Sequence, residues 1–75
     1  MKSRIRSTIR ELRASRAMTQ QELADLIGMT RQTVNAIEGD KYSPSLEVAF
    51  RIAHVFGVPL EEVFRYEVPA KKSKG

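Results

Sequence analysis

Cysteine is absent from this chain of 75 residues, and histidine occurs once. Without cysteine there are no disulfides, no thiol nucleophile and no thiolate metal site, and a single histidine cannot supply a cluster of good zinc ligands. No acidic pair has the spacing of metal ligands, so no catalytic constellation can be assembled. We therefore expect no enzyme and no metal centre, and the sequence carries no signature of a cofactor or a small-molecule ligand.

Long apolar runs are also missing. No window approaches the roughly 20 residues that a membrane-spanning helix needs, and the first residues, MKSRIRSTIRELR, are rich in arginine and lack the apolar stretch of a signal peptide. With 41% hydrophobic and 29% charged residues, the composition is ordinary for a folded soluble chain of one domain. We expect a cytoplasmic protein with no membrane association.

The charge of the chain is positive and unevenly distributed. Thirteen Lys and Arg residues against nine Asp and Glu residues give a net charge of +4, which suggests an anionic partner. Residues 1–16 contain six basic side chains and one acidic one, whereas residues 17–40 contain one basic and four acidic side chains. The middle of the chain is therefore not a basic patch.

Apolar spacing and turn signals predict five short helices. Ile9 and Leu12 share a face of a helix predicted over 7–16. A capping box of Thr19 and Glu22 predicts the start of the second helix. The residues expected to face inward are Leu23, Leu26 and Ile27 in the second helix, and Leu46, Ala49, Ile52, Ala53 and Phe56 in the fourth.

The second and third helices are separated by a short turn. Gly28 is placed to end the second helix in the left-handed conformation, and Thr30 is a good N-cap for a third helix over 31–38. A connection of this length between two helices makes them cross steeply. The sequence therefore predicts a helix-turn-helix over 20–39.

The remaining elements are shorter. Ser45 can cap the fourth helix, which closes at Gly57, and a fifth helix opens near Leu60. The alternating pattern of 64–68 predicts a short strand that pairs with the segment around Ile5. We expect one domain over residues 1–68, followed by a disordered basic tail over 69–75.

Residues 9–64 resemble the short regulators of the Cro and phage-repressor-like helix-turn-helix family. The segments TQQELA and TRQTV carry this resemblance, together with the run that begins at Lys41 and continues through PSLE. The resemblance implies an all-α fold, namely a five-helix domain like that of lambda repressor, in a transcriptional regulator that binds double-stranded DNA as a homodimer. Gly39 and Asp40 depart from the Asn-Gly pair that many members of the family have at this place.

The geometry of a recognition helix predicts the residues that read bases. Such a helix enters the major groove by its N-terminal end, so the outward side chains of its first turns reach base edges. Arginine can bond guanine bidentately, and glutamine or asparagine can do the same with adenine. The predicted base-reading residues are Arg31, Gln32, Asn35 and Thr30, and Arg31 and Gln32 are the leading candidates among them.

The family resemblance implies further roles. Gln20 matches a position that holds the DNA backbone, and the turn formed by Lys41, Tyr42 and Ser43 matches another. Arg13 and Glu38 match positions that form an ion pair between the first helix and the end of the recognition helix. Removing one partner of such a pair when it is partly buried costs about 3–5 kcal/mol.

A homodimer is also expected from size. Half-sites in the major groove recur after about 34–36 Å, which a domain with a radius of gyration of roughly 11 Å cannot cover alone. Two-fold symmetry then predicts an inverted-repeat operator. The candidate interface is the fifth helix and the residues after it, namely Leu60, Val63, Phe64 and Tyr66, and the sequence does not separate core from interface among them.

Two alternatives to a plain DNA regulator remain open. The chain is also compatible with an antitoxin or a restriction-modification controller protein of the same fold. It is equally compatible with a protein-interaction module that uses the exposed face of the third helix, because the fold alone does not determine the function.

Overall fold

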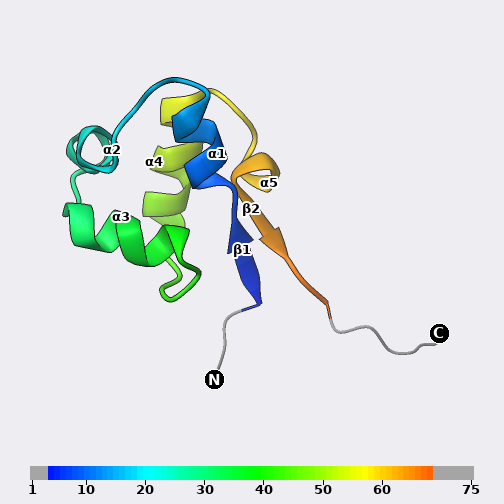
Figure 1. Ribbon diagram of the computed structural model, residues 1–75. Coiled ribbons are helices and arrows are strands. Elements are labelled where there is room, and N and C mark those ends of the chain that lie inside the picture. The colour runs from blue at the N-terminus through cyan, green and yellow to red at the C-terminus, as the bar shows by residue number, and fades with distance from the viewer. Residues whose placement is uncertain (1–3, 69–75) are drawn as a thin grey trace.

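The structure is a computed structural model that describes residues 4–68. In chain order its elements are β1 (Ile5–Ser7), α1 (Ile9–Ala14), α2 (Gln20–Ile27), α3 (Arg31–Glu38), α4 (Leu46–Phe56), α5 (Leu60–Val63) and β2 (Phe64–Tyr66). The helices gather around one core, and the two strands lie together at one side (Figure 1). The predicted five helices and the short strand pair are confirmed, whereas the predicted tail over 69–75 lies outside the described residues.

Local signals in the sequence set the limits of α2 and α3. The Thr19 hydroxyl accepts a hydrogen bond from the Glu22 N–H at 3.0 Å, and the Glu22 carboxylate accepts one from the Thr19 N–H at 2.8 Å. Gly28 ends α2 at φ 73°, where a side chain would be strained. The Thr30 hydroxyl then accepts from the Thr33 N–H at 3.1 Å and caps α3. The capping box and both caps are confirmed.

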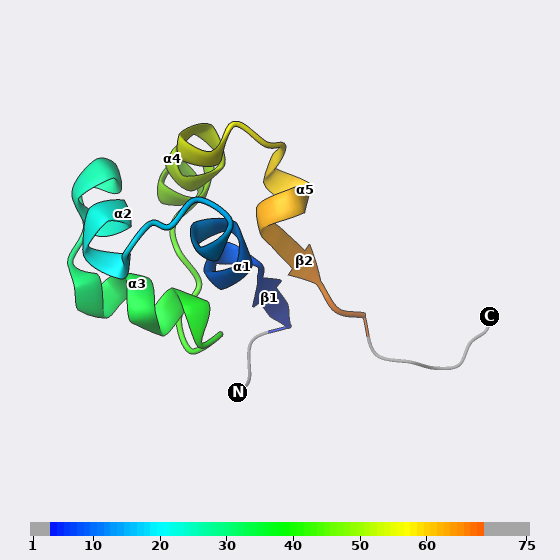
Figure 2. The same cartoon turned by 45° about the horizontal axis from the view of Figure 1, so that its top comes forward.

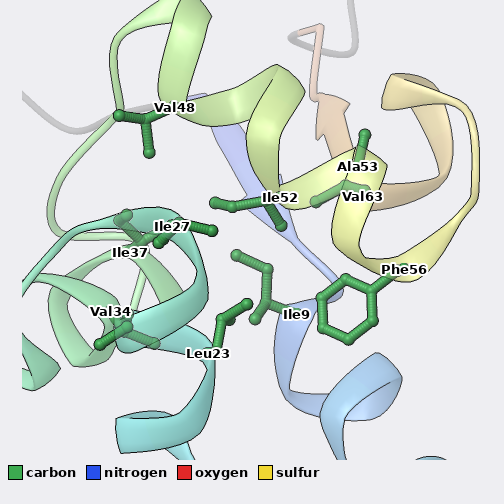
Figure 3. Close-up of a cluster of buried hydrophobic side chains, with 11 residues drawn as sticks. Ile9, Leu23, Ile27, Val34, Ile37, Val48, Ile52, Ala53, Phe56 and Val63 are labelled. Atoms are coloured by element: carbon green, nitrogen blue, oxygen red, sulfur yellow. The ribbon is translucent and has the colours of Figure 1, made fainter.

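The core joins all of the helices. Ile9 of α1, Leu23 of α2 and Ile52 of α4 are completely buried, and they meet in the space between these helices (Figure 3). Burial of an aliphatic side chain of this size contributes about 1.5–3 kcal/mol. The remaining members of the buried cluster are Ala24, Ile27, Val34, Ile37, Val48, Ala53, Phe56 and Val63. One continuous core therefore fixes the orientation of α2 and α3.

Three expectations about helices and their faces are wrong. The first helix covers Ile9–Ala14 rather than 7–16, because Ser7 belongs to β1 and the chain turns after Ala14. Leu26 is 60% exposed and Leu46 is 68% exposed. Leu26 lies beside the buried stripe of α2 rather than within it, and Leu46 is the first residue of α4, where its side chain projects past the core.

The two strands form an antiparallel pair in which Ile5 lies opposite Tyr66 and Ser7 lies opposite Phe64. At one end the Thr8 N–H donates to the Val63 carbonyl at 2.8 Å. At the other end the Glu67 N–H donates to the Arg4 carbonyl at 2.7 Å. β2 lies on the far side of β1 from α3 (Figure 1 and Figure 2). The sheet thus leaves the helix-turn-helix uncovered.

Candidate nucleic-acid interface

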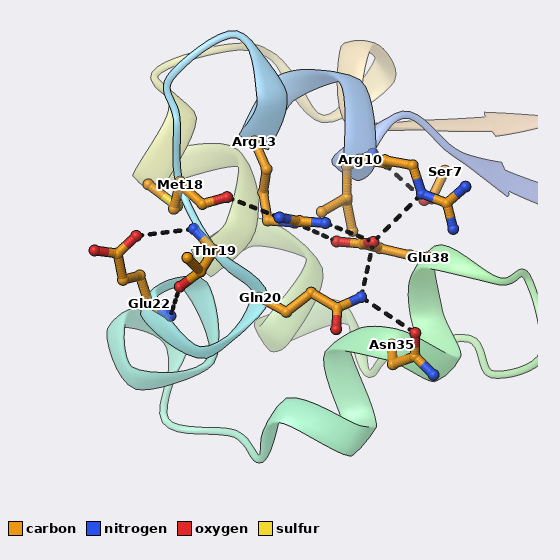
Figure 4. A network of polar contacts seen from close by, with 10 residues as sticks. Ser7, Arg10, Arg13, Met18, Thr19, Gln20, Glu22, Asn35 and Glu38 are labelled. Atoms are coloured by element: carbon orange, nitrogen blue, oxygen red, sulfur yellow. Dashed lines mark hydrogen bonds and ion pairs between the residues drawn. The ribbon is translucent and has the colours of Figure 1, made fainter.

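The C-terminal end of α3 is anchored to α1 by an ion pair. The side chain of Glu38 is fully buried, and that of Arg13 is only 15% exposed. Arg13 donates from Nε to one carboxylate oxygen of Glu38 and from Nη2 to the other at 3.0 Å. Its Nη1 also donates to the Met18 carbonyl at 2.7 Å. The structure therefore brings together the two residues that were predicted to pair (Figure 4).

Opposing effects determine the ionisation of Glu38. Burial disfavours its charged form and by itself would raise its pKa. Hydrogen bonds from Arg13 and Gln20, together with the positive charges of Arg13 and Arg10, outweigh burial and hold the pKa of Glu38 below its ordinary value. The hydrogen bond to Glu38 in turn raises the pKa of Arg13. Both groups are charged at neutral pH, as a salt bridge requires.

Gln20 links the start of α2 to α3. Its side-chain nitrogen donates to Oε1 of Glu38 at 3.1 Å and to Oδ1 of Asn35 at 3.2 Å. A primary amide has two N–H donors, so both are engaged within the protein (Figure 4). Gln20 and Asn35, which were predicted to contact phosphate and base respectively, therefore lie side by side and restrain one another.

The N-terminal end of α3 is the accessible part of this helix. Arg31, Gln32 and Asn35 are exposed. Within residues 4–68, no hydrogen bond or ion pair engages the side chain of Arg31 or Gln32. Thr30 is also exposed, but its hydroxyl is the N-cap of α3 and lies 2.9 Å from the Thr33 hydroxyl. Of the four predicted base-reading residues, Arg31 and Gln32 have the freest side chains.

The turn that follows α3 places further polar groups at the surface. Lys41, Tyr42 and Ser43 are all exposed. The turn is held to α3 because the Lys41 N–H donates to the Ala36 carbonyl at 3.0 Å. The three residues predicted to contact phosphate are thus accessible and sit on a backbone that is fixed to the C-terminal half of α3.

The four residues predicted to form the dimer interface divide between the surface and the core of the chain. Val63 is completely buried within the chain, so its prediction as an interface residue is wrong. Its side chain fills the core at the end of α5. Leu60 and Phe64 are partly buried against the same core, and Tyr66 is 67% exposed. Only the last three present surface to another molecule.

Two polar residues that support this region were not identified from the sequence. Asp40 adopts the left-handed conformation at φ 60°, and its Oδ1 accepts a hydrogen bond from the Ser7 N–H at 3.1 Å. The signal in the sequence that could have identified Asp40 is the Gly39-Asp40 pair, which stands where many members of the family have Asn-Gly. Arg51 of α4 donates from Nη1 to the Ile27 carbonyl at 3.0 Å, which satisfies the end of α2, and no local pattern marks this long-range contact.

Two absences hold for the part of the chain that the structure describes. Between residues 4 and 68, His, Cys, Asp and Glu side chains form no group of three that could hold a metal ion. None of the helices in the same range has both the length and the apolar character that crossing a bilayer requires.

Comparisons with known proteins agree with this geometry. A helix-turn-helix family model matches residues 9–63. An HTH-type transcriptional regulator of Methanocaldococcus jannaschii is 46% identical over 63 residues, which cover 84% of this chain and 96% of the relative. A cryptic phage CTXphi transcriptional repressor of Vibrio cholerae is 40% identical over 57 residues, which cover 76% of this chain and 51% of the relative.

Among solved structures, the restriction-modification controller protein of Aeromonas hydrophila is similar in fold and in sequence. The TM-score is 0.67 at 30% identity, and the match covers 72% of this chain and 82% of that one. The match to the family model extends over most of the chain, from α1 to the end of α5. The chain therefore belongs to the Cro/C1-type helix-turn-helix family of transcriptional regulators.

Proposed function

We propose that this protein is a sequence-specific regulator of transcription that binds a double-stranded operator as a homodimer in the cytoplasm. In this proposal α3 is the recognition helix, and its N-terminal end enters the major groove. Arg31 and Gln32 read base edges, with Asn35 and Thr30 beside them. The operator is an inverted repeat, because a two-fold dimer presents two identical recognition helices.

The contrast between the two ends of α3 carries the proposal. Glu38, at the C-terminal end, is buried and bonded to Arg13 and Gln20. Arg31 and Gln32, at the N-terminal end, project into solvent with no partner among the described residues. A helix that is fixed at one end and exposes bidentate donors at the other is suited to read base edges without reorganisation.

Phosphate contacts are assigned to groups that flank this end. The N–H groups in the first turn of a helix attract anions, and α2 begins at Gln20. Both N–H donors of the Gln20 side chain are bonded within the protein. We therefore assign the contact between Gln20 and the DNA backbone to the peptide N–H of Gln20 at the start of α2. Lys41, Tyr42 and Ser43 supply contacts from the turn after α3. These contacts position the protein but do not distinguish sequences.

Selection of bound sequences from random duplex DNA tests this proposal. A dimeric regulator enriches an inverted repeat, and its log affinity falls against log salt with a slope of about −0.9 for each phosphate neutralised. An antitoxin or a restriction-modification controller of this fold would enrich a site too, but it would also bind a partner protein. A protein-interaction module would enrich no sequence and would show a flat salt response, and that result would overturn the proposal.

A further inference from the structure

Asp40 occupies the backbone position at the end of α3 where glycine is usual. The Asp40 N–H donates to the Ile37 carbonyl at 3.1 Å. The next N–H, that of Lys41, donates to the Ala36 carbonyl at 3.0 Å, and these two bonds form a Schellman motif. The residue at the turning point of such a motif is left-handed and is most often glycine, but here it is Asp40, at φ 60°.

The glycine of this turn stands one residue too early to serve that purpose. Gly39 has φ −83°, a value that any residue adopts, so its conformational freedom is not used. The left-handed position instead carries a carboxylate. A side chain that is held in an unfavourable backbone conformation calls for a compensating contact.

The carboxylate of Asp40 makes such contacts with β1. Its Oδ1 accepts a hydrogen bond from the Ser7 N–H at 3.1 Å, and its Oδ2 lies 3.9 Å from Nε of Arg6. The side chain of Asp40 is only 31% exposed, which is consistent with these contacts. Glycine would fit the backbone at this position but could make neither contact. Asp40 therefore ties the turn after α3 to β1, which lies beside it (Figure 1).

Arg6 extends this connection across the sheet. Its Nε also lies 3.2 Å from Oε1 of Glu67, the residue directly after β2. The charge of Arg6 is therefore available to offset that of Asp40. This compensation is relevant beside DNA, because like charges that face one another across an interface weaken binding.

The three residues after Asp40 have few means of their own to hold a position. Lys41, Tyr42 and Ser43 are exposed, and segments with few buried contacts have low local stability. On the side of α3 the turn is held by the Schellman bonds. On the side of the sheet it is held by the Asp40 carboxylate. The contacts of Asp40 thus determine where the turn begins.

We propose that Asp40 is a positioning residue for DNA binding, which holds Lys41, Tyr42 and Ser43 in the place where they meet the phosphate backbone. This inference rests on the proposed function, which assigns phosphate contacts to this turn. Asp40 itself touches no DNA in this role and acts through its bond to the Ser7 N–H. A turn that is already ordered loses less entropy when DNA binds, so the tether increases affinity.

Asp40→Gly separates the tether from the backbone conformation. Glycine adopts a positive φ without strain, so the end of α3 should stay intact and the midpoint of urea unfolding should change little. DNA affinity should nevertheless fall roughly tenfold, which corresponds to the loss of about one hydrogen bond to a charged group. The slope of log affinity against log salt should become shallower by about 0.9 for each phosphate contact that is lost. The preferred sequence should stay the same.

Asp40→Asn is the conservative variant. Asparagine tolerates the left-handed conformation and keeps an oxygen that can accept from the Ser7 N–H. It should therefore recover most of the affinity and of the salt slope that Asp40→Gly loses. Ala17→Gly is the matched control, because Ala17 also has a positive φ, 53°, in the turn after α1. Relief of strain at that turn should leave DNA affinity and salt slope unchanged.

A second background tests whether Asp40 acts through the turn. In a variant with alanine at positions 41, 42 and 43, the side chains that Asp40 positions are gone. Asp40→Gly should then lower DNA affinity clearly less than it does in the wild type, because the two changes affect one set of contacts and are not additive. An equal loss in both backgrounds would show that Asp40 acts independently of the turn and would overturn the inference.

The outcomes separate this inference from the proposed function. If the wild type selects an operator and Asp40→Gly binds it with the same affinity or the same salt slope, the positioning role is wrong and the proposed function stands. Asp40→Asn binding as weakly as Asp40→Gly has the same meaning. A wild type that selects no duplex overturns the proposed function itself. Weakened binding by Asp40→Gly at an unchanged consensus, with recovery in Asp40→Asn, is the result that we expect.

Discussion

The side-chain nitrogen of Gln20 lies 3.2 Å from Oδ1 of Asn35 and 3.1 Å from Oε1 of Glu38. One residue at the start of α2 therefore holds both the exposed middle and the buried end of α3. This link explains how α3, which is joined to α2 by a short turn, keeps a fixed orientation. It also assigns the Gln20 amide to positioning rather than to direct contact with phosphate.

Replacement of Gln20 with alanine should reduce both stability and DNA affinity. Loss of a hydrogen bond to the buried Glu38 costs about 1–3 kcal/mol in the free energy of unfolding. DNA affinity should fall equally for the selected duplex and for its single-base variants, because Gln20 supports a contact with the DNA backbone and not with a base. Gln21→Ala is the matched control, since Gln21 is exposed and, within residues 4–68, its side chain bonds only to that of Asp25, at 2.9 Å. A changed preference at one base position would contradict this assignment.

Arg13→Met should be among the most destabilising polar substitutions in this chain. It leaves the carboxylate of Glu38 buried without its main counter-charge, at a cost of about 3–5 kcal/mol. Urea unfolding followed by circular dichroism measures this change. Glu47→Gln is the comparison, because the pair of Glu47 with Arg51 is exposed and such pairs are worth about 0.3–0.5 kcal/mol. Equal losses in the two variants would show that burial of the Arg13 pair has no energetic effect.

Stability should decline in acid through Glu38. Its folded pKa is lowered, so the unfolded state binds the proton more readily and the stabilisation is complete only above the unfolded pKa of about 4.3. As pH falls below that value and through the lowered folded pKa, the contribution is lost. Urea unfolding from about pH 7 down to about pH 3 measures this. Glu38→Gln, although less stable at neutral pH, should show a shallower decline, and an unchanged slope would contradict the pairing.

Ala17→Gly should stabilise the chain. Ala17 is exposed and adopts φ 53° in the turn after α1, a conformation that costs an L-residue about 1–2 kcal/mol. Glycine removes this strain and adds entropy to the unfolded state, so a net gain of up to about 1 kcal/mol is expected. Ala14→Gly, within α1, should instead lose about 0.5–1 kcal/mol. Changes of the same sign at both positions would refute this explanation.

The elements of this fold were predictable where the signal is local. The capping box at Thr19, the glycine at position 28 and the N-cap Thr30 each depend on neighbours within a few residues, and all of them appear as predicted. The strand pair was also predicted, from alternation at 64–68 and its match to Ile5. The cap signals act on backbone groups within a few residues, so tertiary context does not override them. The strand pair joins segments that are far apart in sequence, and its prediction depended on alternation alone.

The contacts that fix the candidate site were not predictable in the same way. Asp40 with Ser7 and Arg51 with Ile27 join residues that are far apart in sequence, and periodicity contains no information about such pairs. Val63 illustrates a related limit. An apolar residue after a helix start can fill the core or an interface, and only the packing of α5 against its neighbours in the fold, such as α4, decides between them. The Arg13 and Glu38 pair was found because the family resemblance supplied it.

The central claim is that the N-terminal end of α3 reads bases, and parallel selection experiments on the wild type and Gln32→Ala test it most directly. His54→Ala serves as the control, since His54 is an exposed residue of α4. If Gln32 reads a base, its loss removes about 1–3 kcal/mol of discrimination at one base pair in each half-site, while the remaining positions keep their preference. An identical consensus from the wild type and Gln32→Ala, or uniform weakening with no position relaxed, would contradict the claim.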